Sequence, residues 1–257
     1  MFRMSFTKVI LIGSCIISLI FCSCEDTHSK KTKENVLKNQ KETSSKEVEQ
    51  QKPKDTTAKN DSKTLNVTKK KEEEPFKLSN ENMKEFLLEY GKNNPETLVR
   101  VKTKFGNIDI QLYKESPIHR ANFIYLVKEK YFDETFFYRV AKGFVIQGGN
   151  SDRKQMAQKR HEIGDYTLPQ EPIKGLTHNR GSVALSKQWV DNPSNRSTPY
   201  EFFIVIAKLG AHHLDGEHTI FGKVVKGMNV ADKISNVPVD GSEWPKENIF
   251  IKAEVIR

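Results

Sequence analysis

The chain has 257 residues, and 42 lysines and arginines against 33 aspartates and glutamates give it a formal net charge of +9. This length allows one or two domains. The positive charge is scattered along the chain rather than gathered in one segment, so it does not favour a nucleic acid as partner. All three cysteines lie near the N-terminus, which excludes a disulfide framework in the remainder.

The N-terminus resembles a bacterial export signal. Arg3 and Lys8 precede an apolar run over residues 9–21, which has the length of a signal peptide and is short for a membrane-spanning helix. We therefore interpret residues 1–23 as a lipoprotein signal peptide.

Cys24 is the expected lipidation site. A serine before it and two acidic residues after it resemble the lipobox of bacterial lipoproteins. Cys15 also fits the pattern but would leave a very short apolar core upstream, and Cys22 is a further alternative. Because two or more acyl chains give stable anchoring, this resemblance implies a lipid-anchored protein of the bacterial cell envelope, facing the periplasm or the surface. A cleaved signal without lipid is the other interpretation.

Residues 24–76 are predicted to be a disordered tether. This segment is rich in Lys, Glu, Asn, Gln, Ser and Thr and has almost no aromatic residue, so it cannot bury enough apolar surface to offset chain entropy. Its nearly balanced charges keep it solvated. We expect it to hold the following domain away from the membrane.

Residues 77–98 are predicted to form an N-terminal helical extension. Ser79 is a candidate N-cap, apolar residues recur at helical spacing from Met83 to Tyr90, and Gly91 is expected to end the helix. Period-two alternation over residues 97–113 then predicts a β-hairpin. Ser116 and Pro117 are expected to begin a well-buried helix.

The remaining elements are mostly short strands. We expect two strands over residues 136–149 around a Lys-Gly turn, and a loop over residues 150–179 whose basic run is solvated. Further strands are predicted over 181–186, 201–207, 219–225 and 249–256, with a polar loop over 191–199 and a helix over 228–234. Six or more short strands with two or three helices are typical of a closed antiparallel barrel or a sandwich.

Two polar residues lie within the apolar stretch 136–149. Alternation puts Arg139 and Gln147 among apolar neighbours. Removing a cation from water at such a place costs free energy unless an acceptor pairs with it. Arg139 therefore needs either a structural carboxylate or a ligand acceptor. An arginine that snorkels at a strand end is the other interpretation.

Four stretches together resemble the cyclophilin-type peptidyl-prolyl cis-trans isomerases. They are Phe-Tyr-Arg-Val around Arg139, Gly-Phe-Val-Ile-Gln-Gly-Gly at 143–149, Glu-Phe-Phe-Ile-Val at 201–205 and Leu-Asp-Gly-Glu-His-Thr-Ile-Phe-Gly at 214–222. The resemblance covers about residues 99–257 and implies a mainly β fold, a closed eight-stranded antiparallel barrel capped by two helices. The helix in 77–98 resembles an extension in lipoprotein members from Bacteroidetes-like bacteria.

The resemblance also implies the site residues. Arg139 falls on the catalytic arginine of the family, and Gln147 on its polar partner. The residues implied in substrate binding are Phe144, Val145, Phe203, Leu214 and His218, which would form the proline pocket, together with Lys187, Glu201 and His213.

Three of these positions, and Tyr138 beside Arg139, depart from the family's usual residues. Lys187 stands where an Asn is more usual, Glu201 where the family has Gln, and His213 where Trp or Phe is common; Tyr138 replaces a frequent His. We expect Glu201 to lie near Arg139, where it would compete with substrate or orient the guanidinium. We expect His213 to alter the binding of bulky cyclic ligands more than turnover.

The chemistry of proline isomerisation explains the need for an arginine. Rotation about an X-Pro bond has a barrier of roughly 18–20 kcal/mol because it breaks amide resonance and leaves a localised lone pair on nitrogen. A charged donor such as Arg139 stabilises the twisted state more than the planar ones. No metal, nucleophile or cofactor is required, and the spacing of His212, His213 and His218 does not favour zinc. A hydrolase built on Ser182 or Ser186 lacks a nucleophile-elbow sequence.

We therefore expect a monomeric isomerase that acts on proline-containing exported polypeptides. The main alternative is a proline-peptide binding or chaperone module that has lost turnover, and Glu201 and Lys187 are the residues that favour it. A third possibility is a surface adhesin whose barrel is only a scaffold.

Overall fold

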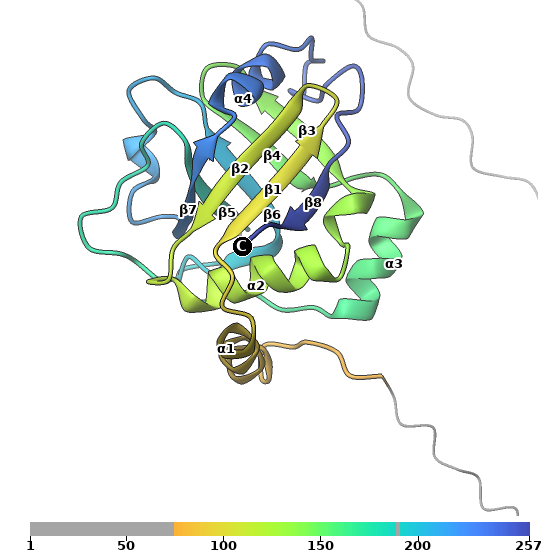
Figure 1. Ribbon diagram of the computed structural model, residues 1–257, viewed down its shortest axis with the longest axis vertical. Coiled ribbons are helices and arrows are strands. Elements are labelled where there is room, and N and C mark those ends of the chain that lie inside the picture. The colour runs from red at the N-terminus through yellow and green to blue at the C-terminus, as the bar shows by residue number, and fades with distance from the viewer. Residues whose placement is uncertain (1–74, 189–190) are drawn as a thin grey trace, which may run out of the picture. The chain divides into compact units, whose positions relative to one another are not determined.

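The described part of the chain, residues 75–188 and 191–257 of a computed structural model, is organised on one antiparallel sheet of eight strands (Figure 1). The predicted signal peptide, Cys15, Cys22, Cys24 and nearly all of the predicted tether lie outside the described residues. Among the described residues, no helix has the length and apolar character needed to span a bilayer.

The strands follow the period-two patterns of the sequence, and they are β1 Leu98–Thr103, β2 Gly106–Leu112, β3 Phe136–Ala141, β4 Val145–Asn150, β5 Ser182–Lys187, β6 Ser197–Val205, β7 Ile220–Lys226 and β8 Lys252–Val255. Their order in the sheet is β3-β4-β6-β5-β7-β2-β1-β8. The first strand after the predicted 191–199 loop begins earlier than expected, because Ser197 already pairs with Lys187 of β5.

The prediction of a closed barrel is wrong, because the sheet curls into an open half-barrel. Its edge strands are β3 and β8. Near this open side the described residues form one bridge, Phe136 to Phe250, with flanking backbone bonds from Phe137 N to Ile249 O and from Ile251 N to Thr135 O, both 3.0 Å. In this antiparallel register β8 lies opposite the residues before β3, so the bridge does not extend into a row of pairs between the two strands.

The structure has four α-helices in its described part, α1 Met83–Asn93, α2 Pro117–Lys128, α3 Lys154–Ile163 and α4 Met228–Ser235, and two 3-10 turns, η1 Phe132–Glu134 and η2 His212–Leu214. As predicted, α2 and α4 cover the sheet; they lie at opposite ends of it, and α1 packs on the outside of α2 (Figure 1).

The helix α1 begins later and ends later than the sequence predicts. Ser79 lies before it: its backbone N–H donates to the Asn82 side chain at 2.8 Å, and its carbonyl accepts from Met83 N at 3.0 Å. Gly91 lies inside the helix rather than at its end. A Cβ at Gly91 would lie 3.0 Å from the Cβ of Ala121, so the glycine serves the close approach of α1 to α2.

The helix α3 lies where a solvated loop was predicted, so that interpretation is wrong. The helix has only two buried residues, Met156 and Ile163, which is too few for a recognisable apolar stripe. Its basic residues are not all solvated, because the Arg160 guanidinium lies 3.1 Å from a Glu201 carboxylate oxygen. Gly164, at φ +131°, ends the helix where a Cβ would overlap the backbone of Leu78.

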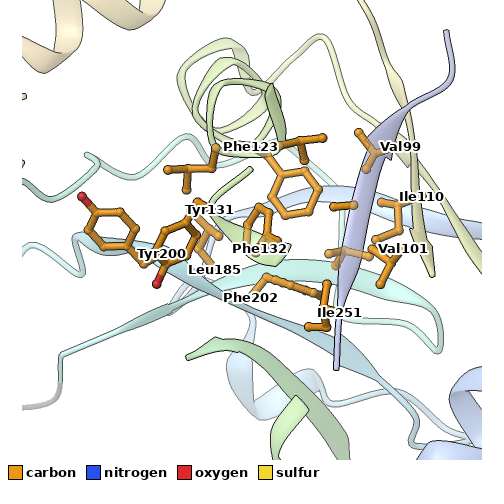
Figure 2. Close-up of a cluster of buried hydrophobic side chains, with 14 of the residues drawn as sticks. Val99, Val101, Ile110, Phe123, Tyr131, Phe132, Leu185, Tyr200, Phe202 and Ile251 are labelled. Carbon is orange, nitrogen blue, oxygen red and sulfur yellow. The ribbon is translucent and has the colours of Figure 1, made fainter. Parts of the chain in front are cut away.

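The main core lies between the concave face of the sheet and α2, as Figure 2 shows. Phe123 of α2 packs against Phe132, Phe202 and Phe221 with ring centroids 5.0 to 5.5 Å apart. Strand alternation sends the next residue, Phe203, to the other face of the sheet, where it belongs to a second, smaller apolar cluster. This second cluster is the base of the candidate site.

Candidate active site

A pocket of about 480 Å³ lies over the second apolar cluster, on the face of β3, β4, β6 and β5 that points away from the main core. Its lining residues are Tyr138, Arg139, Phe144, Val145, Gln147, Ser186, Lys187, Glu201, Phe203, His213, Leu214 and His218. All ten residues that the sequence assigned to catalysis and substrate binding are therefore brought together. Tyr138 and Ser186 complete the lining. A second cavity of about 700 Å³, under the N-terminal segment and α3, adjoins it through Lys187 and Glu201.

The floor of the pocket is apolar and aromatic. Phe203 is 5% exposed and lies between two histidine rings, His178 stacked at 6.1 Å and His218 edge-on at 5.3 Å. At the opposite wall the His213 ring stacks on Phe144 at 5.2 Å. These rigid walls suit a small apolar ring such as that of proline.

A bulge in β3 brings two consecutive side chains to the pocket. Phe137 pairs with Gly148 and Arg139 with Gln147, so Tyr138 is an extra residue in the strand. Regular alternation would turn Tyr138 and Arg139 to opposite faces, whereas a bulge re-aims one of them. Both therefore line the same pocket.

The Arg139 guanidinium lies at the edge of the pocket between two partners. Its Nη1 donates to Gln147 Oε1 at 3.5 Å, and its Nε lies 2.8 Å from Glu243 Oε2. The sequence required a carboxylate or a ligand acceptor for this cation, and we expected Glu201 near it, as a competitor of substrate or as a group that orients the guanidinium. Glu201 lies in the same pocket, but the carboxylate that contacts Arg139 directly belongs to Glu243. No sequence signal pointed to Glu243, which follows α4 in a loop without regular structure.

Glu201 instead belongs to a network that begins on α3. Its Oε1 accepts from Arg160 Nη2 at 3.1 Å and from Asn150 Nδ2 at 3.0 Å, and its Oε2 accepts from the Tyr138 hydroxyl at 2.9 Å. Burial, with the neighbouring Glu201 charge, raises the pKa of Tyr138 far above its ordinary value. The hydroxyl therefore stays protonated, and because a carboxylate only accepts, its proton points to Glu201.

Because the Tyr138 hydroxyl donates to Glu201, the orientation of the Gln147 amide is fixed. Gln147 Nε2 donates to the Tyr138 oxygen and, at 2.8 Å, to Ser186 Oγ. Since both donors of the amide are used there, its oxygen faces Arg139. The carboxylate of Glu201 thus acts on Arg139 through Tyr138 and Gln147 rather than by direct contact.

The remaining charged residues of the lining are paired or neutral. The Lys187 ammonium contacts the Glu217 carboxylate and also donates to Asn195 Oδ1 at 2.5 Å. His218 Nδ1 donates to the Leu185 carbonyl at 3.0 Å. Burial lowers the pKa of His218 to about 4, so the ring is neutral at pH 7.

The described residues contain no group of three or more His, Cys, Asp or Glu side chains placed to hold a metal ion. His178 Nδ1 lies 2.7 Å from Asp215 Oδ1, and His212 Nδ1 lies 3.1 Å from Asp215 Oδ2. Sequence reasoning missed His178, which supports Phe203 from behind and has no motif of its own.

This half-barrel with an arginine-edged apolar pocket has the fold of the cyclophilins. A crystal structure of a cyclophilin type peptidyl-prolyl cis-trans isomerase from Cryptosporidium parvum matches it with a TM-score of 0.53 at 26% identity, covering 63% of this chain and 98% of that one. The model of the cyclophilin type peptidyl-prolyl cis-trans isomerase/CLD family matches residues 98–255. The chain belongs to this family.

Curated relatives agree with this assignment. A peptidyl-prolyl cis-trans isomerase of Acinetobacter baylyi is 37% identical over 146 residues, which are 55% of this chain and 73% of that protein. A peptidyl-prolyl cis-trans isomerase-like 1 protein of Neurospora crassa is 35% identical over 163 residues, 63% of this chain and 95% of that protein. Membership of the family assigns peptidyl-prolyl cis-trans isomerase activity to the chain.

Proposed function

We propose that this protein accelerates X-Pro bond rotation with Arg139 as its catalytic residue and the Phe203 pocket as the seat of the proline ring. The observation that carries the proposal is that Arg139 lines the same pocket as the apolar residues Phe144, Phe203 and Leu214. The ion pair of Arg139 with Glu243 contributes little to the stability of the fold, because the two side chains are 37% and 44% exposed.

The reaction needs no covalent step. When the amide twists, the proline nitrogen loses resonance and gains a lone pair that accepts a hydrogen bond from an Arg139 N–H. The planar ground states offer no such lone pair, so the bond stabilises the twisted state selectively. Phe144, Phe203 and Leu214 hold the ring while the preceding carbonyl swings, and exclusion of water strengthens the charged hydrogen bond.

The client class follows from the N-terminal sequence. We infer that residues 1–23 direct export, that Cys24 carries the lipid, and that residues 24–76 tether the isomerase in the bacterial cell envelope, where it acts on exported proline-containing polypeptides as a monomer. Slow X-Pro steps limit the folding of such chains. Incorporation of a labelled fatty acid, lost in Cys24→Ser and kept in Cys22→Ser and Cys15→Ser, tests the anchor.

The activity is tested by NMR exchange between the cis and trans forms of an X-Pro peptide, with the full chain and its Arg139→Ala variant. We expect fast exchange that falls by about 100-fold or more in the variant, since one charged transition-state donor is worth about 3 kcal/mol. Arg100→Ala is the matched control, because Arg100 is also a strand arginine paired with a carboxylate, Asp109 at 2.7 Å, outside the pocket.

The same experiment distinguishes an isomerase from the alternative, a binding module without turnover. That alternative rested on Lys187 and on Glu201 as a competitor for Arg139, and Glu201 pairs with Arg160 rather than with Arg139. Peptide binding with exchange at the uncatalysed rate would restore it and end the proposal for Arg139. If the peptide does not bind and its cis-trans exchange is not accelerated, the third possibility is favoured, a surface adhesin in which the domain is only a scaffold.

A further inference from the structure

The loop that follows α4 holds Glu243 in a backbone conformation that glutamate rarely adopts. Its φ is +63°, in the left-handed region that glycine and asparagine enter most readily. The loop is well fixed around it. The Asp240 carboxylate accepts from Ser242 N at 2.8 Å and from Trp244 N at 3.0 Å, and Val140 N of β3 donates to the Glu243 carbonyl at 2.8 Å.

The backbone of this loop does not require a glutamate. The bonds that fix it use backbone groups and the side chain of Asp240, and none uses the Glu243 side chain, so an asparagine or glycine at position 243 would satisfy the same backbone with less strain. A strained residue that the backbone does not need is a reason to examine what its side chain does.

The Glu243 side chain reaches Arg139. Its Oε2 lies 2.8 Å from Arg139 Nε, and the two side chains are 44% and 37% exposed. An ion pair this exposed contributes little to stability, so stability does not account for the glutamate.

Together with Gln147, this contact limits the orientations that the Arg139 guanidinium can adopt. Glu243 engages Nε on the side of the loop, and Gln147 accepts from Nη1 on the side of β4. Arginine has many rotamers, and ordering them before the substrate arrives lowers the entropy lost when the transition-state hydrogen bond forms.

We propose that Glu243 is a positioning residue for Arg139: it holds the guanidinium by its Nε edge so that the terminal nitrogens remain directed to the proline nitrogen. This inference rests on the proposed catalytic role of Arg139 and adds a residue from outside the pocket lining.

The test is Glu243→Asn in the full chain, with kcat and KM taken from NMR exchange of a proline peptide and the unfolding midpoint measured beside them. We expect kcat to fall about five-fold with KM changed by less than about two-fold, because positioning acts on the transition state. We expect the unfolding midpoint to stay or to rise by up to about 3 °C, because asparagine relieves the backbone. A merely structural glutamate would lower the midpoint.

Two further variants make the test specific. Glu247→Asn removes a carboxylate from the same loop that pairs with Lys104 at 2.8 Å, and it should leave kcat unchanged. In an Arg139→Lys background, Glu243→Asn should change kcat by less than about 1.5-fold, because the group it positions is gone.

The outcomes separate this inference from the proposed function. If the wild type catalyses exchange and Arg139→Ala abolishes it, while Glu243→Asn keeps or raises kcat, the positioning role is overturned and the isomerase mechanism stands. Exchange at the uncatalysed rate with the wild type overturns both.

Discussion

Replacement of Glu201 by Gln tests the network that orients the site, and its effect can be worked out from proton positions. The carboxylate obliges the Tyr138 hydroxyl to donate to it, which leaves the Tyr138 oxygen to accept from Gln147 Nε2. In the variant, the amide that replaces this carboxylate can present its NH₂ group to Tyr138. The hydroxyl then donates to Gln147, whose amide turns and points its own donors at Arg139.

The expected magnitudes follow from the contacts that change. Arg139 loses its amide acceptor, worth about 1 kcal/mol, so kcat should fall about five-fold. Stability should fall by about 1–2 kcal/mol, since the Arg160 and Glu201 side chains are 31% and 18% exposed, between the surface and buried cases. Arg160 keeps its bond to the Tyr131 hydroxyl at 2.8 Å, which limits the loss.

The assay is kcat from NMR exchange with a saturating proline peptide, for Glu201→Gln in the wild type and in a Tyr138→Phe background. Without the Tyr138 hydroxyl the carboxylate no longer communicates with Gln147, so Glu201→Gln should leave kcat unchanged there. Equal losses of kcat in both backgrounds would refute the reasoning, and so would an unchanged kcat in the wild type.

Two further predictions concern the histidines of the pocket. The pKa of His218, about 4 in the folded chain, lies below its unfolded value of 6.5, so the folded state binds this proton less tightly. Its share of stability, up to about 3 kcal/mol, is present above pH 6.5 and is lost as the pH falls to 4; denaturant unfolding across this range should show a slope that His218→Gln reduces. His213→Trp should extend the stack on Phe144 and tighten a bulky cyclic peptide about two- to ten-fold with turnover unchanged, whereas equal changes in binding and kcat would contradict this assignment.

The pocket could be predicted from sequence because its residues lie in short, strongly patterned stretches. Strand alternation separates Phe202, in the main core, from Phe203, in the pocket, and the same period places Gln147 beside Arg139. The resemblance of four motifs to the cyclophilins then assigned ten residues to one site, eight of them within the motifs, although sequence alone does not indicate the hydrogen bonds between them.

The parts that sequence did not predict depend on contacts between distant segments. Helix α3 has a polar composition and is recognised only by what it packs against, and Glu243 lies in a loop whose position depends on a backbone bond to Val140. The open edge between β3 and β8 was missed for a similar reason. The number of strands can be read from the alternation of apolar and polar residues. Closure of the sheet depends instead on how many residues of the edge strands β3 and β8 pair with each other.

Two departures from the family's usual residues, Tyr138 and Glu201, are best understood together with Arg160. A carboxylate in place of Gln at position 201 would be a partly buried charge without compensation, and Arg160 of α3 supplies that compensation. The carboxylate in turn needs a donor on its other oxygen, which a tyrosine hydroxyl provides at 2.9 Å. Substituting any one of the three removes or re-orients a hydrogen bond that the other two use. The three residues therefore form one structural unit, and α3 belongs to the active site although none of its residues lines the proline pocket.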